Sequence, residues 1–232
     1  MITKIEASKR HHAKMGWLNT YYLFSFAHYF DPENLQFGSL RVFNDDTIDA
    51  YAGFSEHGHE NMEIVTIMFK GTLTHTDSMG NRKKIHVGEV QRMSAGTGVI
   101  HSEKNLDDEQ VELYQIWLLP TKDGIEPSYE QKDFSFLQEK NTLVPIVSGS
   151  PTGEALTMHT DAAIYLTELE EGRAVTMNVE KNRGVFVYVR RGEIRLNDES
   201  FQAGDQARIQ NEEMLLMQAT KESVFVLIDV PL

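Results

Sequence analysis

The stretch "GFSEHGHENMEIVTIMFKGTLTHTDSMGN", residues 53–81, places two histidines directly before a run of β-branched and apolar residues. His57 and His59 are two residues apart, and side chains at i and i+2 of a β-strand point to the same face. The two imidazoles are therefore expected to share a face, either as metal ligands or as a polar rim. The segment "DSMGN" predicts a hairpin turn between two strands within residues 62–88.

A second pair of ligand-capable residues lies in "SAGTGVIHSEKN", residues 94–105, where His101 and Glu103 are again two apart. If the two segments lie side by side in one sheet or barrel, three imidazoles and one carboxylate converge. Such a set suits a divalent first-row ion: iron, manganese, nickel, cobalt, copper or zinc. Because pairs of this spacing also arise by chance, spacing alone leaves open that all four are surface residues of a β-domain.

Short strand-like segments dominate the rest of the chain, and no segment of comparable length has a helical period. Glycine, asparagine and aspartate separate these segments, which favours an all-β sandwich or closed barrel. The predicted strands outside the first hairpin fall within residues 21–31, 111–120, 163–172, 183–209 and 223–232.

The chain also contains an internal repeat. Residues 64–96 and 185–213 share the order strand, glycine, strand, turn, then glycine before an acidic residue. Gly71 aligns with Gly192, and Gly88 aligns with Gly204. Two copies of one β-module are the simplest interpretation.

The polar residues 122–134 are expected to connect the two modules, so we predict domains at residues 1–125 and 126–232. Only one of the 9 histidines, His159, lies beyond residue 101. If both halves share a fold, the metal site belongs to the first domain and is absent from the second.

Composition excludes several classes of function. The formal net charge of −13, without a basic stripe, argues against direct nucleic-acid binding. With no cysteine, thiolate zinc sites, disulfides and cysteine nucleophiles are excluded, so a metal must be held by His, Asp or Glu. No apolar run resembles a signal peptide or a membrane span, and we expect a cytoplasmic protein.

These residues resemble the first motif of the cupin superfamily, which here is Gly53, His57, His59, Glu63 and Gly71. More narrowly, the chain is similar to the pirins, above all to bacterial pirin-like proteins with quercetinase activity. The resemblance extends from about residue 10 to residue 120, and the C-terminal half is similar more loosely. The blocks that carry it are "GWLNTYYLFSFAHYFDP" (16–32), "LRVFNDD" (40–46), residues 53–81 and "RMSAGTGVIHSE" (92–103).

The resemblance implies a bicupin, in which two β-barrel domains pack face to face and only the N-terminal one binds metal. It implies metal ligands at the positions of His57, His59, His101 and Glu103. Iron is the favoured ion, and the other first-row ions named above remain alternatives. Glu63 is expected to support a ligand through hydrogen bonding rather than to bind the ion, although the alternative that it replaces Glu103 as ligand stays open.

The function that the resemblance implies is an oxidoreductase, quercetin 2,3-dioxygenase, with a flavonol and O₂ as substrates and CO as a product. Glu103 would also be catalytic, because its carboxylate could accept the proton of the flavonol hydroxyl. The alternative is a non-catalytic, metal-binding regulatory protein whose surface binds a protein partner. We expect a monomer, since two fused modules already pair the surfaces that single cupins use to dimerise.

The remaining histidines and the aromatic residues are predicted to be structural. His75, near the turn, is expected to face solvent; His28, among aromatic residues, is expected in the core or an interface. His86 precedes a predicted turn and is taken as structural. The aromatic residues predicted to be core rather than substrate wall are Phe24, Phe26, Tyr29, Phe30 and Trp117.

Overall fold

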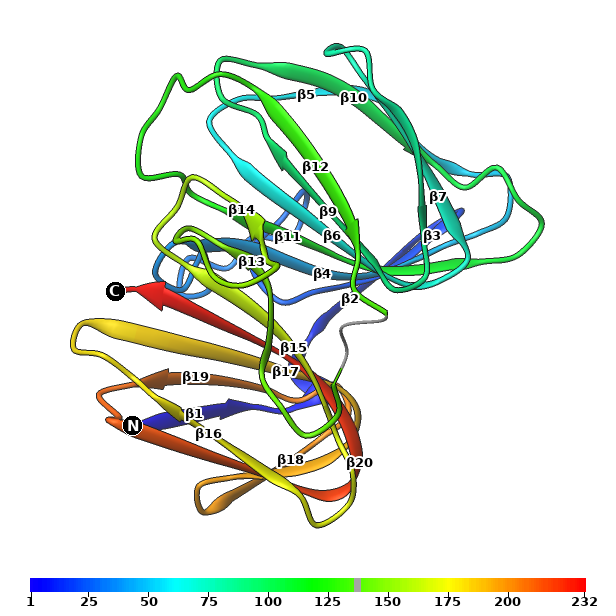
Figure 1. Cartoon of the computed structure of the whole chain (residues 1–232). Coiled ribbons are helices and arrows are strands. Elements are labelled where there is room, and N and C mark those ends of the chain that lie inside the picture. The colour runs from blue at the N-terminus through cyan, green and yellow to red at the C-terminus, as the bar shows by residue number, and fades with distance from the viewer. Residues whose placement is uncertain (136–138) are drawn as a thin grey trace.

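The computed structural model describes residues 1–135 and 139–232, which form mostly antiparallel sheets in two stacked halves (Figure 1). Among the described residues there is no α-helix, only a short 3-10 turn at Ala7–Lys9. The all-β prediction is therefore confirmed. Within the same described part of the chain, no helix has the length and apolarity needed to span a bilayer.

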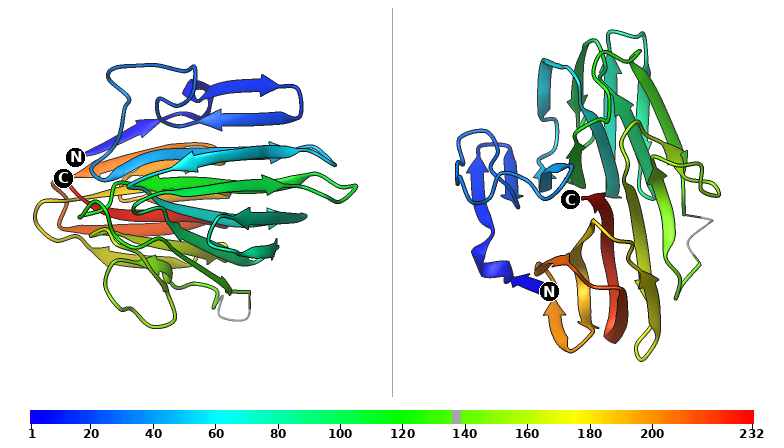
Figure 2. Two further views of the ribbon diagram at one scale, coloured as in Figure 1. Left: turned by 90° about the horizontal axis from the view of Figure 1, so that it is seen from above. Right: turned by 90° about the vertical axis from the view of Figure 1, so that its left-hand side faces the viewer.

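The N-terminal half is a barrel made of two sheets that face each other. Its seven-stranded sheet has the order β12 (Ser128–Asp133), β9 (Glu89–Ser94), β6 (Glu63–Lys70), β11 (Val111–Leu118), β4 (Leu40–Ile48), β3 (Leu18–Tyr22) and β2 (His11–Met15). Its four-stranded sheet has the order β5 (Gly53–His59), β10 (Val99–Lys104), β7 (Thr72–Asp77) and β8 (Arg82–His86). Strands β2 and β3 form one edge of the stack (Figure 2).

The C-terminal half is one nine-stranded sheet that bends over itself. Its main order is β1 (Ile2–Ile5), β19 (Gln206–Gln210), β17 (Arg183–Leu196), β20 (Met214–Pro231), β15 (Ala163–Leu169), β13 (Val144–Ser148) and β14 (Leu156–Thr157). Off this path, β16 (Ala174–Asn178) pairs with β20, and β18 (Glu199–Gln202) pairs with β17. The β17–β20 ladder shifts register between Val189 and Glu193. Such irregularities bend strands, so both strands contribute to two walls.

The largest apolar core lies between the two halves, which pack face to face. Phe43 of the N-terminal half contacts Phe186 and Tyr188 of the C-terminal half, with ring centroids 5.4 and 5.1 Å apart. Strand β6 is buried on both faces, because Val65 belongs to this shared core while Met68 points into the N-terminal barrel. This explains its nearly continuous apolar sequence.

Backbone geometry agrees with the predicted repeat. Gly71 and Gly192 have φ angles of +72° and +83°, and Gly88 and Gly204 have +86° and +87°. Each aligned pair therefore makes the same left-handed turn, a conformation in which residues with a side chain are strained. The acidic residue after the second glycine also accepts a backbone N–H three residues earlier in both copies.

Two predicted segments differ from the structure. The predicted strand at 21–31 ends at Tyr22, and a loop with a single Phe26–Tyr29 bridge follows, because its aromatic rings pack against other elements instead of extending a ladder. The segment 122–134, predicted as a polar connection, contains β12, which pairs along its whole length with β9. A solvated edge strand can be as polar as a loop.

Strand pairing crosses the domain boundary predicted at residues 125 and 126, which stays a prediction. Strand β1 starts the chain but pairs with β19 in the C-terminal sheet, beside which it lies in Figure 1. Strand β12 follows the boundary but completes the N-terminal sheet. The seven-stranded and the nine-stranded sheet thus each include a strand from the other side of the predicted boundary.

Candidate metal centre

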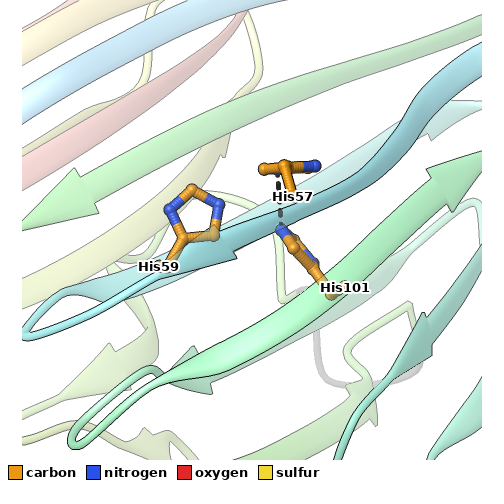
Figure 3. Close-up of side chains that lie close together, drawn as sticks. All are labelled: His57, His59 and His101. Atoms are coloured by element: carbon orange, nitrogen blue, oxygen red, sulfur yellow. Dashed lines mark hydrogen bonds between the residues drawn. The ribbon is translucent and has the colours of Figure 1, made fainter.

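Three histidines from two separated segments meet inside the N-terminal barrel (Figure 3). His57 and His59 lie on β5, and His101 lies directly opposite His57 on the neighbouring strand β10. One ring nitrogen from each lies within 4.8 Å of the other two. The Nε2 atoms of His57 and His101 are 3.0 Å apart. The antiparallel ladder therefore brings the three predicted histidines together, whereas Glu103 groups with His75 and His101.

The surroundings of the histidines favour neutral rings with lone pairs available. Burial, with His57 nearby, lowers the pKa of His59 to about 4. Burial and the neighbouring imidazoles lower the pKa of His101 to about 3. A divalent ion about 2.1 Å from two imidazole nitrogens holds those atoms roughly 3–3.4 Å apart, so the donor set fits such an ion.

Glu103 lies beside His101 with one oxygen unused. Its side chain is buried, its Oε2 accepts a hydrogen bond of 2.8 Å from Nε2 of Gln115, and its Oε1 has no hydrogen-bond partner among the described residues. Burial raises the pKa of Glu103 to about 7. An unpartnered buried carboxylate oxygen suits a metal ion or a substrate hydroxyl. Its assignment as the fourth ligand stays a prediction.

Glu63 is directed elsewhere. Its Oε2 accepts a hydrogen bond of 2.8 Å from Oγ of Ser94, and its Oε1 lies 3.6 Å from Nδ1 of His159. The described residues contain two groups of three potential ligands: His57, His59 and His101, and His75, His101 and Glu103. Glu63 belongs to neither. This placement favours the interpretation in which Glu63 does not bind the ion.

The prediction that His75 faces solvent is wrong, since its side chain is 0% exposed. Strand β7 continues to Asp77 and pairs with β8 on one side and with β10 on the other. His75 Nε2 lies 2.8 Å from Oδ2 of Asp77, and its Nδ1 lies 3.5 Å from Nδ1 of His101. The alternation of Leu73, His75 and Asp77 along one strand face is the sequence signal that could have placed it inside.

Other side chains also differ from expectation. His28, expected in the core or an interface, is exposed in the loop after β3, so the core alternative is wrong. Phe30 is 74% exposed, whereas Phe24 is fully buried as predicted. Phe26 and Trp117, predicted as core, line the pocket above the histidines, and their rings meet edge to face at 5.2 Å.

A pocket of about 440 Å³ opens above the three histidines. Its walls are mostly aromatic, and its base is polar. The apolar lining consists of Trp17, Phe26, Phe54, Ile64 and Trp117, and the polar lining includes Asn44, Asp46, His57, His59, His101, Glu103 and Gln115. Burial raises the pKa of Asp46 to about 7, with Asp45 and Glu103 adding to the shift. Sequence reasoning identified the histidines and Glu103, but none of the wall residues.

Comparison with known proteins agrees with this architecture. Residues 5–118 match the pirin family, and residues 145–230 match the quercetinase C-terminal cupin domain. Quercetin 2,3-dioxygenase of Escherichia coli K12 is 38% identical over 232 residues, covering 100% of this chain and 99% of that protein. The chain belongs to the pirin family. A pirin-like protein of Caulobacter vibrioides is 36% identical over 230 residues, covering 99% of each chain.

Solved structures also support the assignment of this chain to the pirin family. The bacterial pirin YhhW of E. coli, in complex with nickel(II), superposes with a TM-score of 0.95 at 37% identity, covering 100% of this chain and 99% of that one. YhaK of E. coli superposes with a TM-score of 0.77 at 26% identity, covering 94% and 96%. The predicted bicupin fold is thereby confirmed. Nickel is a property of the YhhW complex; iron, favoured for this pirin, stays a prediction.

Proposed function

We propose that this pirin is a metal-dependent dioxygenase that opens the central ring of a flavonol such as quercetin with O₂ and releases CO. The observation that carries the proposal is the pocket of about 440 Å³ directly above the histidine triad. This volume lies within the roughly 300–1,000 Å³ of small-molecule sites. The relative named quercetin 2,3-dioxygenase, which aligns along the whole chain, supports the choice of substrate.

A divalent ion held by His57, His59, His101 and Glu103 would act as a Lewis acid that lowers the pKa of a phenolic hydroxyl. We assign the acceptance of the hydroxyl proton to Glu103, whose Oε1 has no hydrogen-bond partner among the described residues and would leave the ion to bond the hydroxyl. Gln115 holds the other oxygen at 2.8 Å and so restrains the carboxylate. Burial raises the pKa of Glu103 to about 7 in the metal-free protein, so this carboxylate is more basic than an exposed glutamate.

The pocket walls suit a flat aromatic substrate. Phe26, Phe54 and Trp117 present ring faces and edges, which exclude water and orient a planar molecule. In the proposed reaction two carbon–carbon bonds of the central ring break, and both oxygen atoms of O₂ enter the ring-opened product. The carbon between the broken bonds leaves with its oxygen as CO, so atoms balance without a further reductant.

The regulatory alternative requires a different surface. A protein that only signals the state of its metal needs a closed site beside a flat docking patch, because a partner reads the outside of the barrel. The open pocket instead gives a small molecule access to the histidines. We therefore favour catalysis, with a flavonol rather than a protein as the partner.

Substituting Glu103→Gln tests the proposal, with Glu63→Gln as the matched control. Loss of the proton acceptor should lower quercetin turnover by about 10²–10⁴-fold while the three histidines still hold the metal. Turnover is followed by flavonol absorbance and released CO, and metal content by elemental analysis. Glu63→Gln should retain metal and activity. If Glu63→Gln loses the metal while Glu103→Gln behaves as wild type, the ligand assignment is wrong; if metal-loaded wild-type protein leaves quercetin intact, the substrate is wrong.

A further inference from the structure

Behind the histidine triad lies a buried pair that the proposed chemistry does not use. His75 and Asp77 follow each other on one face of β7, and their side chains are both 0% exposed. His75 touches Asp77 on one side and His101 on the other, at 2.8 and 3.5 Å. The three residues form a chain that ends at the nitrogen of His101 facing His57.

Asp77 is held rigidly by the hairpin turn. Its Oδ1 accepts hydrogen bonds from the backbone N–H groups of Met79 and Asn81, at 2.9 and 3.0 Å. The side chain of Asn81 donates a further bond of 2.9 Å to Oδ2. A carboxylate in this position accepts only, so the facing Nε2 of His75 carries a proton. The turn therefore determines the tautomer of His75.

The tautomer of His75 determines the tautomer of His101. With its proton on Nε2, a neutral His75 presents a lone pair at Nδ1, which faces Nδ1 of His101. Nδ1 of His101 then carries the proton that it donates to His75. Nε2 of His101 is left with a free lone pair, and this is the atom 3.0 Å from Nε2 of His57. A neutral imidazole with one free nitrogen is the form that binds a metal ion.

We propose that His75 and Asp77 are positioning residues that fix the tautomer of His101 and thereby set the metal affinity of the site. This inference rests on the metal centre of the proposed function but not on the identity of the substrate. Partners that orient a metal-binding histidine contribute about 10–100-fold to metal affinity in other proteins. His75 itself does not bind the ion, because its two nitrogens are both engaged.

The decisive substitution is Asp77→Asn, because it keeps the size of the side chain and reverses the hydrogen bond to His75. The bond that Oδ2 accepts from the Asn81 side chain must reverse with it, by rotation of the Asn81 amide. The backbone N–H groups of the turn keep the oxygen of Asn at the Oδ1 position, so its NH₂ group faces His75 and donates. His75 must then carry its proton on Nδ1, and His101 must carry its proton on Nε2, the nitrogen required by the metal. Asp31→Asn is the matched control: Asp31 also caps a turn, through a 3.0 Å bond to the backbone of Glu33.

Two measurements on full-length metal-free protein read out the effect without any assay of activity. Two-bond ¹H–¹⁵N spectra of the imidazoles report which nitrogen of His101 is protonated, and titration with nickel or zinc gives affinity and stoichiometry. We expect Asp77→Asn to move the proton of His101 from Nδ1 to Nε2 and to weaken metal binding by about 10–100-fold. Asp31→Asn should leave both unchanged.

A second pair of variants separates the hydrogen bond from packing. Asn and Leu have nearly the same shape, but only Asn places an acceptor oxygen near the position of His75 Nδ1. His75→Asn should therefore bind metal within about threefold of wild type, and His75→Leu about 10–100-fold more weakly. Equal affinities for the two variants, or an unchanged His101 tautomer in Asp77→Asn, would overturn the proposal. Binding of two metal equivalents would also overturn it, because His75 and Glu103 would then be ligands of a second ion.

Discussion

The two barrels place different chemistry at the same positions. If Gly71 is aligned with Gly192, His75 of the first barrel corresponds to Leu196 of the second. The ladder partner of His75 is Glu103, and the partner of Leu196 is Met217. A buried imidazole facing a carboxylate in one barrel is thus a leucine facing a methionine in the other.

The correspondence continues to the remaining ligands. His101, two residues before Glu103, pairs with His57. Leu215, two residues before Met217, pairs with Met177. Similar strand pairing therefore positions a metal site in one half and an apolar core in the other. The β10–β5 ladder also has a register shift between His101 and Glu103, which the β20–β16 ladder lacks.

The polar residues in the interior of the first barrel lower its stability. Glu103, Asp46 and Asn44 each leave a buried oxygen without a hydrogen-bond partner among the described residues, and all three line the pocket. The interior of the second barrel is a continuous apolar cluster. Unpartnered polar atoms destabilise a fold, and proteins retain them where function requires them. The second barrel is thus expected to be the more stable scaffold.

The largest effect is expected when the first barrel receives the residues of the second. His57→Met/His101→Leu removes two ligands and should abolish metal binding and lower turnover at least about 10³-fold. Without the desolvated imidazoles, the protein should unfold at an equal or higher denaturant concentration. Elemental analysis, CO release and urea unfolding measure these effects. His86→Leu, which removes an exposed histidine, is the control; metal retained by the double variant would contradict the correspondence.

The converse substitution, Leu196→His, should destabilise the second barrel by about 3–5 kcal/mol, measured by urea unfolding. Leu196 is fully buried, and Asp198, at the position of Asp77, is fully exposed, so the new imidazole finds no acceptor there. Leu216→His is the control, because Leu216 is 41% exposed and should change stability little. A Leu196→His protein as stable as wild type would show that the two interiors tolerate polarity equally.

The third prediction concerns the pH dependence of the free energy of unfolding. The pKa of Asp46 is raised from 3.8 to about 7 by burial, so the folded state holds its proton more tightly than the unfolded state. The resulting stabilisation is complete below about pH 4 and is lost as the pH rises through about 7, a loss of about 4 kcal/mol in metal-free protein. Urea unfolding at several pH values should show a steeper slope in wild type than in Asp46→Asn, which keeps the contribution of other buried carboxyls such as Glu103, whose pKa is also raised to about 7. Asp198→Asn, which removes an exposed carboxylate from the second barrel, should keep the full slope; an Asp46→Asn slope as steep as that of wild type would show that Asp46 does not contribute.

The sequence by itself determined the all-β class, the repeat and the three histidines. These follow from local rules: alternation places i and i+2 side chains on one face, and glycines mark left-handed turns. His57 and His59 therefore could be paired with His101 before any coordinates were known. Spacing also put forward Glu103, and the pirin resemblance favoured it over Glu63 as the fourth ligand.

Only the tertiary structure decided which side chains surround those histidines. The burial of His75 depends on the four-stranded sheet that contains β7 facing the seven-stranded sheet. The pocket position of Trp117, on β11 of that second sheet, depends on the same arrangement. The pairing of β1 with the C-terminal sheet joins residues about 200 apart in the chain. Such contacts depend on how the sheets stack and close. The sequence of one strand does not specify which residues of another sheet pack against it.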